Sequence, residues 1–153
     1  MDKNEEVKLD KNTVIVRTDG GICSQIAFAA LGKYFEDKGY KVKYDLNWFK
    51  NWGKGLDGHF IMNYDMPKAF PGIIFETATD DEIKYYKENC IITGSVPECT
   101  APAYVNGYPK ERRSLSIKYA DYFRMNFHPV DKEEVVVLEK EMLSVKSCVN
   151  ENI

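Results

Sequence analysis

Hydrophobic and polar positions between residues 14 and 45 follow the pattern of a strand, a helix and a second strand. Val14–Val16 is a short β-branched run, and an apolar stretch at helical spacing extends from about residue 24 to residue 38. Residues 40–45 then alternate apolar and charged side chains, as a half-buried strand does. A glycine turn precedes the helix and Gly39 follows it. The pattern therefore predicts one βαβ unit with parallel strands and a right-handed crossover.

The middle of the chain combines irregular structure with a second helix and strand. Residues 46–75 mix aromatic side chains with glycines and prolines, which predicts irregular packing with one short helix near residues 66–70. Thr79 and Glu82 lie at capping-box spacing and predict a helix that ends near residue 89. The apolar run that follows predicts a buried strand ended by a glycine.

The last third of the chain is predicted to form a loop followed by two helices. Three prolines and a glycine between residues 95 and 109 indicate a long loop. Residues 114–127 place apolar side chains at helical spacing, and a proline ends this helix. A second capping-box pattern, with an acidic cap, opens a last helix over residues 131–146. Residues 1–12 are mostly charged and polar and are expected to be a flexible leader, so that the domain extends over residues 13–153.

The predicted elements indicate an α/β domain of Rossmann-like class, with a mostly parallel sheet between two helical layers, and composition supports a folded domain. The chain has 153 residues, of which 44% are hydrophobic and 13% aromatic, enough for a core of its own. The net charge of −3 argues against a general polyanion binder, so nucleic acid is not an expected partner.

Apolar runs and cysteines indicate where the chain is expected to work. No run approaches the roughly 20 apolar residues that span a membrane, and no signal peptide opens the sequence. The expected location is the cytoplasm, where the four cysteines stay free thiols. No Cys-x-x-Cys pair or histidine cluster occurs, so no metal site is expected.

The glycine turn between the first strand and the helix is the first place to search for a ligand site. In open α/β folds ligands bind at the carboxyl edge of the sheet, where this turn lies. Gly20 and Gly21 before a helix N-terminus offer backbone N–H groups and a partial positive charge to an anion or a sugar hydroxyl. Ser24 is the expected N-cap. The turn matches neither the dinucleotide-binding nor the P-loop pattern, so a purely structural role stays open.

Other residues that can carry chemistry are spread along the chain, each with a structural alternative. Cys23 is either a nucleophile at a helix N-terminus or a buried inert thiol. The aromatic set around Trp48 either stacks on a sugar or belongs to the core. Asp45 and Asp65 are candidate acids or bases, although no pair of carboxylates stands out. The basic run Lys110–Arg113 either meets a phosphate or is solvated surface.

Several stretches between residues 13 and 75 occur in the order found in one enzyme family. The first strand is followed by Asp-Gly-Gly-Ile-Cys-Ser-Gln-Ile at residues 19–26 and by Ala-Ala-Leu-Gly at residues 29–32. Tyr-Asp-Leu-Asn-Trp-Phe at residues 44–49 and Asn-Tyr-Asp-Met-Pro-Lys-Ala-Phe-Pro at residues 63–71 come next. Together these stretches resemble the opening of the α-1,2-fucosyltransferases, glycosyltransferase family eleven.

The resemblance implies a GT-B-like glycosyltransferase that transfers L-fucose from GDP-fucose to the 2-hydroxyl of a galactose, with inversion and without a metal or cofactor. The implied partners are this nucleotide sugar and a bacterial surface glycan. Such a glycan is built on the cytoplasmic side, so a lipid-linked acceptor would bring the enzyme to the inner face of the membrane. No catalytic residue is implied. The residues implied for the sugar pocket are Gly20, Gly21, Ser24, Gln25, Asp45 and Trp48.

The chain departs from the family pattern in the turn and in one missing motif. Cys23 and Ser24 stand where the family has glycine and asparagine, and a hydroxyl lacks the two-sided hydrogen-bonding capacity of an amide. The family's His-x-Arg-Arg-Gly-Asp motif, whose arginine holds the donor phosphates, does not occur, because Arg112 and Arg113 lack its flanking residues.

These departures lead to the expectation that the chain is the N-terminal, acceptor-side half of such an enzyme, without the C-terminal donor-binding domain. The alternative is a non-catalytic α/β binding module or an inactive truncated relative. A sheet edge or apolar patch exposed by a missing half would favour self-association.

Overall fold

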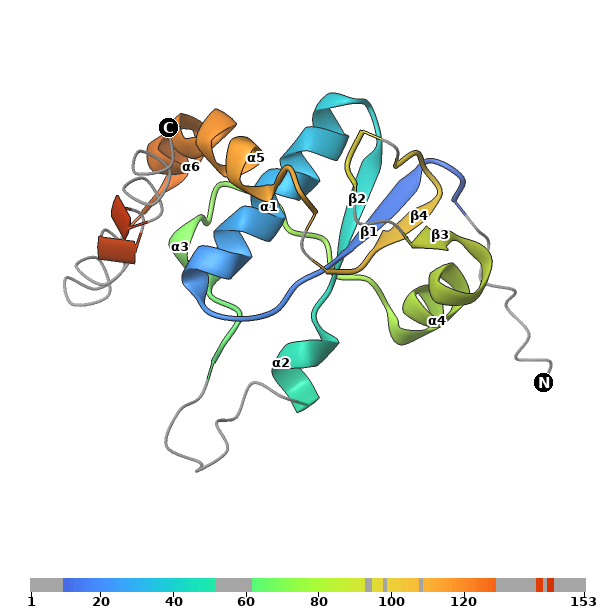
Figure 1. Ribbon diagram of the computed structural model, residues 1–153. Coiled ribbons are helices and arrows are strands. Elements are labelled where there is room, and N and C mark those ends of the chain that lie inside the picture. Colours follow the sequence, from blue (N-terminus) through green and yellow to red (C-terminus); the bar gives the residue numbers. More distant parts are fainter. Residues whose placement is uncertain are drawn as a thin grey trace.

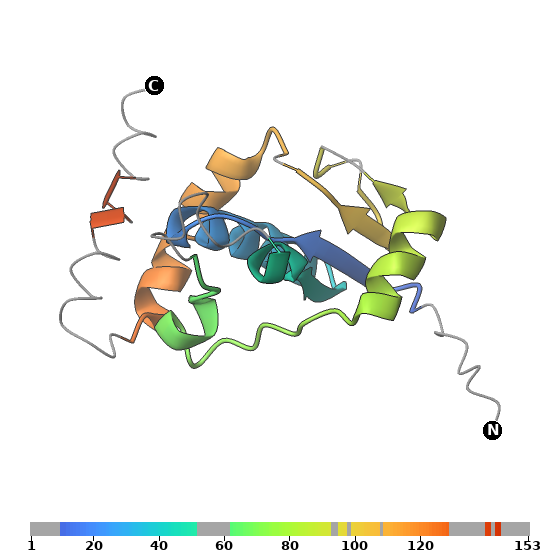
Figure 2. The same cartoon turned by 90° about the horizontal axis from the view of Figure 1, so that it is seen from below.

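A parallel sheet runs through the centre of the fold, with helices on both of its faces (Figures 1 and 2). The computed structural model describes residues 10–51, 62–92, 95–97, 99–107, 109–128, 140–141 and 143–144. Within these residues the sheet has four strands in the order β2-β1-β4-β3, all parallel. The strands are β1 (Thr13–Arg17), β2 (Lys41–Asp45), β3 (Ile91–Ile92) and β4 (Ala103–Val105). The helices are α1 (Ile22–Asp37), α2 (Asn47–Asn51), α3 (Met66–Ala69), α4 (Asp80–Asn89), α5 (Arg112–Lys118) and α6 (Ala120–Asn126).

The predicted βαβ unit is confirmed in β1, α1 and β2. Strands β1 and β2 are parallel, with Arg17 in register with Asp45, and Gly39 follows the end of α1. The N-cap prediction is wrong, because α1 begins at Ile22 and Gly21 is its N-cap. Helical hydrogen bonding has already started there, since the N–H of Gln25 donates to the carbonyl of Gly21 at 3.0 Å.

Strand β4 lies where the sequence predicted only a loop. Its three residues are buried and pair with β1 on one side and β3 on the other, with Tyr104 beside Ile15. A three-residue strand between prolines is too short to produce a visible alternation, which is why the loop prediction over residues 95–109 is wrong at this point. The strand places Tyr104 in the middle of the sheet.

The remaining predictions have mixed outcomes. The short helix near residues 66–70 and the capped helix ending at residue 89 are confirmed as α3 and α4. The predicted helix over residues 114–127 is two helices, because Tyr119 leaves helical geometry with a ψ of 8° between α5 and α6. Helix α2 was not predicted. The leader up to residue 9 and most of the predicted last helix lie outside the described residues.

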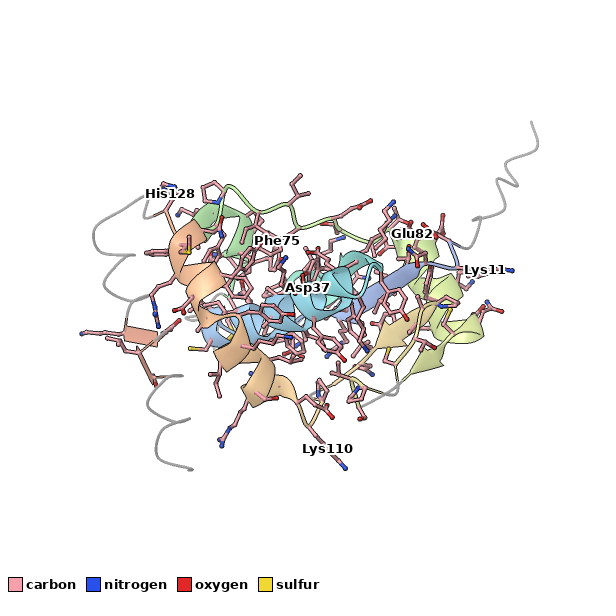
Figure 3. The ribbon with its side chains drawn as sticks, turned by 90° about the horizontal axis from the view of Figure 1, so that it is seen from above. Lys11, Asp37, Phe75, Glu82, Lys110 and His128 are labelled. Carbon is pink, nitrogen blue, oxygen red and sulfur yellow. The ribbon has the colours of Figure 1, made fainter. Side chains whose placement is uncertain are left out.

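The two faces of the sheet are covered unequally. One face packs against α1, α3, α5 and α6 through a large apolar cluster that includes Val14, Phe35 and Phe123. The other face carries α4 and a small cluster formed by Ile15, Ala78, Ile83, Tyr86 and Tyr104. Figure 3 shows Glu82 of α4 at one end of the molecule and His128, just after α6, at the opposite end. The fold is thus an α/β sheet between helices, in agreement with the predicted Rossmann-like class.

Two further features bear on the sheet edge and on membranes. The edge of β2 is extended by a parallel bridge between Tyr44 and Thr77. Among the helices of the described residues, none has the length and apolar character needed to cross a bilayer.

Candidate functional site

The glycine turn and the end of β2 meet at the carboxyl edge of the sheet. Thr18, the first residue after β1, donates its backbone N–H to the carbonyl of Asp45 at 3.0 Å. The turn continues into α1, whereas β2 continues into α2 (Figure 1). Two of the stretches that carried the family resemblance therefore lie side by side, at the edge where parallel α/β folds bind ligands.

Gly20 is required by the shape of this turn, whereas Gly21 is not. Gly20 has a φ of +78°, and a Cβ there would lie 2.9 Å from both Cβ and Oγ of Ser24. Gly21 is exposed, has a φ of −77°, and would meet nothing within 4 Å. Gly21 is the N-cap of α1 and has no side chain that could accept hydrogen bonds from the first-turn N–H groups. A ligand oxygen could therefore accept from these groups instead.

Gln25 holds the turn in place from beneath. Its side chain is 1% exposed, and its Nε2 donates to the carbonyls of Gly20 at 3.1 Å and Asn63 at 2.8 Å. Its Oε1 accepts from the N–H of Asp65 at 2.9 Å. Both amide hydrogens are therefore committed to backbone. Gln25 ties the turn to the segment before α3, and its direct sugar contact stays a prediction.

Ser24 and the basic run are brought together, although 88 positions separate them in the sequence. The Nη2 of Arg112 donates to Oγ of Ser24 at 3.3 Å, and its guanidinium lies over the Phe28 ring at 5.9 Å. Ser24 thus contacts a cation instead of capping α1. Cys23 on the same turn donates from Sγ to the carbonyl of Glu141 at 3.4 Å.

Asp45 is a buried carboxylate whose two oxygens are both held. Its Oδ2 accepts from the hydroxyl of Tyr104, and its Oδ1 accepts from the N–H of Asn47 at 3.0 Å. Asp45 is 3% exposed and Tyr104 is fully buried. Burial raises the pKa of the Tyr104 hydroxyl, and the Asp45 carboxylate raises it further against the opposing effect of Arg17. Tyr104 therefore stays protonated and donates.

Arg17 and Asp19 form an ion pair beside this carboxylate. The guanidinium Nη1 lies 2.8 Å from Oδ2 of Asp19, and the two side chains are 31% and 13% exposed. Alternation along the strands puts Arg17 on the same face as Asp45 and Tyr104. We call Arg17, Asp19, Asp45 and Tyr104 the polar edge cluster. Arg17, Asp19 and Tyr104 were missed as site residues. Tyr104 meets Asp45 only once β4 is placed, and the Arg17–Asp19 pair becomes part of the site through the β1–β2 register.

Trp48 belongs to an aromatic row beside this cluster. In α2 its ring packs edge-on against Phe49 with centroids 5.2 Å apart, and Phe49 contacts Tyr64 at 5.5 Å. Trp48 is half-buried, so a part of the indole reaches solvent. Trp48 can therefore serve both alternatives, as a core residue and as a stacking surface.

The other candidate acid, Asp65, lies at the start of α3 and is joined to the turn through Gln25. Burial raises the pKa of Glu141, and the charge of Asp65 raises it further. In the part of the chain that the structure describes, no group of three or more metal-ligating side chains occurs.

Known proteins provide no relative with which this site can be compared. No protein-family model matches the chain, and no curated protein and no solved structure matches it significantly.

Proposed function

We propose that this chain forms the acceptor-side domain of an α-1,2-fucosyltransferase, which transfers L-fucose from GDP-fucose to the 2-hydroxyl of a galactose with inversion. The observation that supports the proposal most is the contact between Thr18 and Asp45, which joins two of the family-like stretches at one sheet edge.

The proposed roles follow from what fucosyl transfer needs. A sugar acceptor needs hydrogen-bond donors and acceptors for its hydroxyls and an apolar surface for its C–H face. The Arg17–Asp19 pair offers the first, and Trp48 offers the second. The first-turn N–H groups beyond Gly21 suit a hydroxyl oxygen of the acceptor sugar.

We assign the phosphates of GDP-fucose to a second, donor-side domain, as the resemblance implies. The acceptor would be a galactose-terminated surface glycan, and a lipid-linked glycan would bring the protein to the inner face of the membrane. On this division of labour the 153-residue chain binds the acceptor but transfers fucose poorly by itself.

The proposal is tested by galactoside binding and by transfer. Saturation-transfer NMR with a β-galactoside should show binding to the full chain, with mannosides as the sugar control. Trp48→Ala should weaken that binding about fivefold, because an aromatic contact contributes about 1 kcal/mol. A folded chain that binds no galactoside contradicts the acceptor role. Robust transfer from GDP-fucose by this chain alone contradicts the division between domains.

A non-catalytic binding module is the second candidate, and one observation favours it. Gln25 is the residue of the turn that matches the family pattern beside the departures at Cys23 and Ser24. It donates both of its amide hydrogens to backbone carbonyls, as a purely structural residue would. Such a module would bind a glycan without forming any fucosylated product, even when a donor-side domain is supplied. Mass spectrometry of the acceptor after incubation with GDP-fucose and that domain distinguishes the two candidates.

A further inference from the structure

Two hydrogen bonds lead from Tyr104 in the central sheet through Asp45 to Asn47, the residue before Trp48. We infer that Tyr104 is a positioning residue, which fixes the Asp45 carboxylate and, through Asn47, the start of the helix that carries Trp48. The inference rests on the proposed function in so far as Trp48 contacts the acceptor. The path itself consists of interactions between described residues.

The first step of the path is the bond between Tyr104 and Asp45. A buried carboxylate is costly unless its oxygens accept hydrogen bonds, and Asp45 is 3% exposed. Tyr104 is held in the middle of the sheet between β1 and β3, so its hydroxyl approaches from a fixed direction. The bond to Oδ2 therefore sets the plane in which the carboxylate lies.

The second step joins the carboxylate to α2. The N–H of Asn47 donates to Oδ1 of Asp45 at 3.0 Å, and its side-chain amide donates to Oδ1 of Asp80 at 3.0 Å. Helix α2 has five residues and buries none of them fully. So short a helix is not stable by itself and depends on such contacts for its position. A turn of the Asp45 carboxylate would therefore displace Trp48.

The test compares two tyrosine-to-phenylalanine variants of the full chain. Tyr104→Phe removes the hydroxyl that holds Asp45. Tyr119→Phe is the matched control, because its hydroxyl also donates to a carboxylate, that of Asp37 at 2.7 Å, between α5 and the end of α1. We expect amide exchange of the α2 residues to rise about tenfold in Tyr104→Phe, since one hydrogen bond is lost, and to stay unchanged in the control. The dissociation constant for the β-galactoside should rise in Tyr104→Phe alone.

Asp45→Ala provides a second variant, which leaves Tyr104 in place. It removes both carboxylate oxygens, so neither the Tyr104 hydroxyl nor the N–H of Asn47 keeps its acceptor. Exchange in α2 should rise here as well, and this variant decides the matter if Tyr104→Phe does not fold. Unchanged α2 exchange in the folded variants overturns the positioning role. Faster α2 exchange in a chain that binds no galactoside upholds the positioning role and removes the proposed function instead.

Discussion

Gly32 sets how closely α1 approaches the sheet. A Cβ at this position would lie 2.0 Å from the hydroxyl oxygen of Tyr44, which is buried in β2 beneath the helix. Burial raises the pKa of that tyrosine well above its ordinary value, so it stays neutral in the core. The glycine of the family-like Ala-Ala-Leu-Gly stretch therefore has a packing reason that needs no ligand.

Gly32→Ala should lower the free energy of unfolding. The added methyl group in a filled core forces its neighbours to move, and this packing cost is about 1–3 kcal/mol. The higher helix propensity of alanine offsets about 1 kcal/mol of the cost. Urea denaturation near neutral pH measures the difference. Gly72→Ala is the control, since Gly72 is exposed and a Cβ there would lie 3.9 Å from Oδ1 of Asn126, an ordinary contact. Equal urea midpoints for the two variants would contradict the packing argument.

Single residues also show how far the sequence can be followed. The positions of Gly20 and Gly21 were predictable, because a turn between a strand and a helix leaves a local signal. The partners of Gln25 and Ser24 were not, because Asn63 and Arg112 are distant in sequence and come close only through the packing of α1. The glycine turn was thus located correctly, and its role as a ligand site stays a prediction. The contacts of its side chains came from the structure.

At the scale of elements, the predictions were right where the sequence signal is local. Helix α4 was predicted with its capping box, and the structure confirms it. Oγ1 of Thr79 accepts from the N–H of Glu82 at 3.2 Å, and Oε2 of Glu82 accepts from the N–H of Thr79 at 2.9 Å. Strand β4 was missed because its partners, β1 and β3, are distant in sequence or only two residues long. Local signals fixed the helix, whereas only tertiary contacts fix that strand.

Glu82→Gln should make stability less dependent on pH at the acidic end. Burial raises the pKa of Glu82, but the hydrogen bonds from Lys43 and from the Thr79 N–H outweigh it, so the pKa lies below 4.5. A folded-state pKa that is lowered stabilises the fold above the unfolded value and loses this effect as pH falls through the folded value. The loss should therefore occur below about pH 4.5 in the parent chain.

Urea denaturation at a series of pH values measures this slope. At neutral pH, Glu82→Gln should lower the free energy of unfolding, and Thr79→Ala should cost about 1 kcal/mol because the cap is lost. Glu88→Gln serves as the control, since Glu88 is on the same helix and exposed. An acid slope that is the same in Glu82→Gln and in Glu88→Gln would rule out the role of Glu82.

For the molecule as a whole, the two faces of the sheet differ in what holds them. The face under α1 has an apolar cluster that reaches from β2 to α6, and Phe35 and Phe70 are fully buried in it. The face under α4 has a small cluster, extended by the ion pairs of Lys43 with Glu76 and Glu82. Alternation along the predicted strands indicated two faces, but their unequal depth depends on which helices return to the sheet.

This difference predicts the order in which the native chain opens. Free energies of local opening are lowest where few apolar side chains are buried. Amides of α4 should therefore exchange at least about tenfold faster than the central amides of α1, which open only with global unfolding. Hydrogen exchange followed by mass spectrometry under native conditions measures both helices in one sample. Ile83→Ala should speed exchange in α4 and leave α1 nearly unchanged, because Ile83 belongs to the small cluster alone. If Ile83→Ala accelerated α1 and α4 equally, the two faces would form a single cooperative unit.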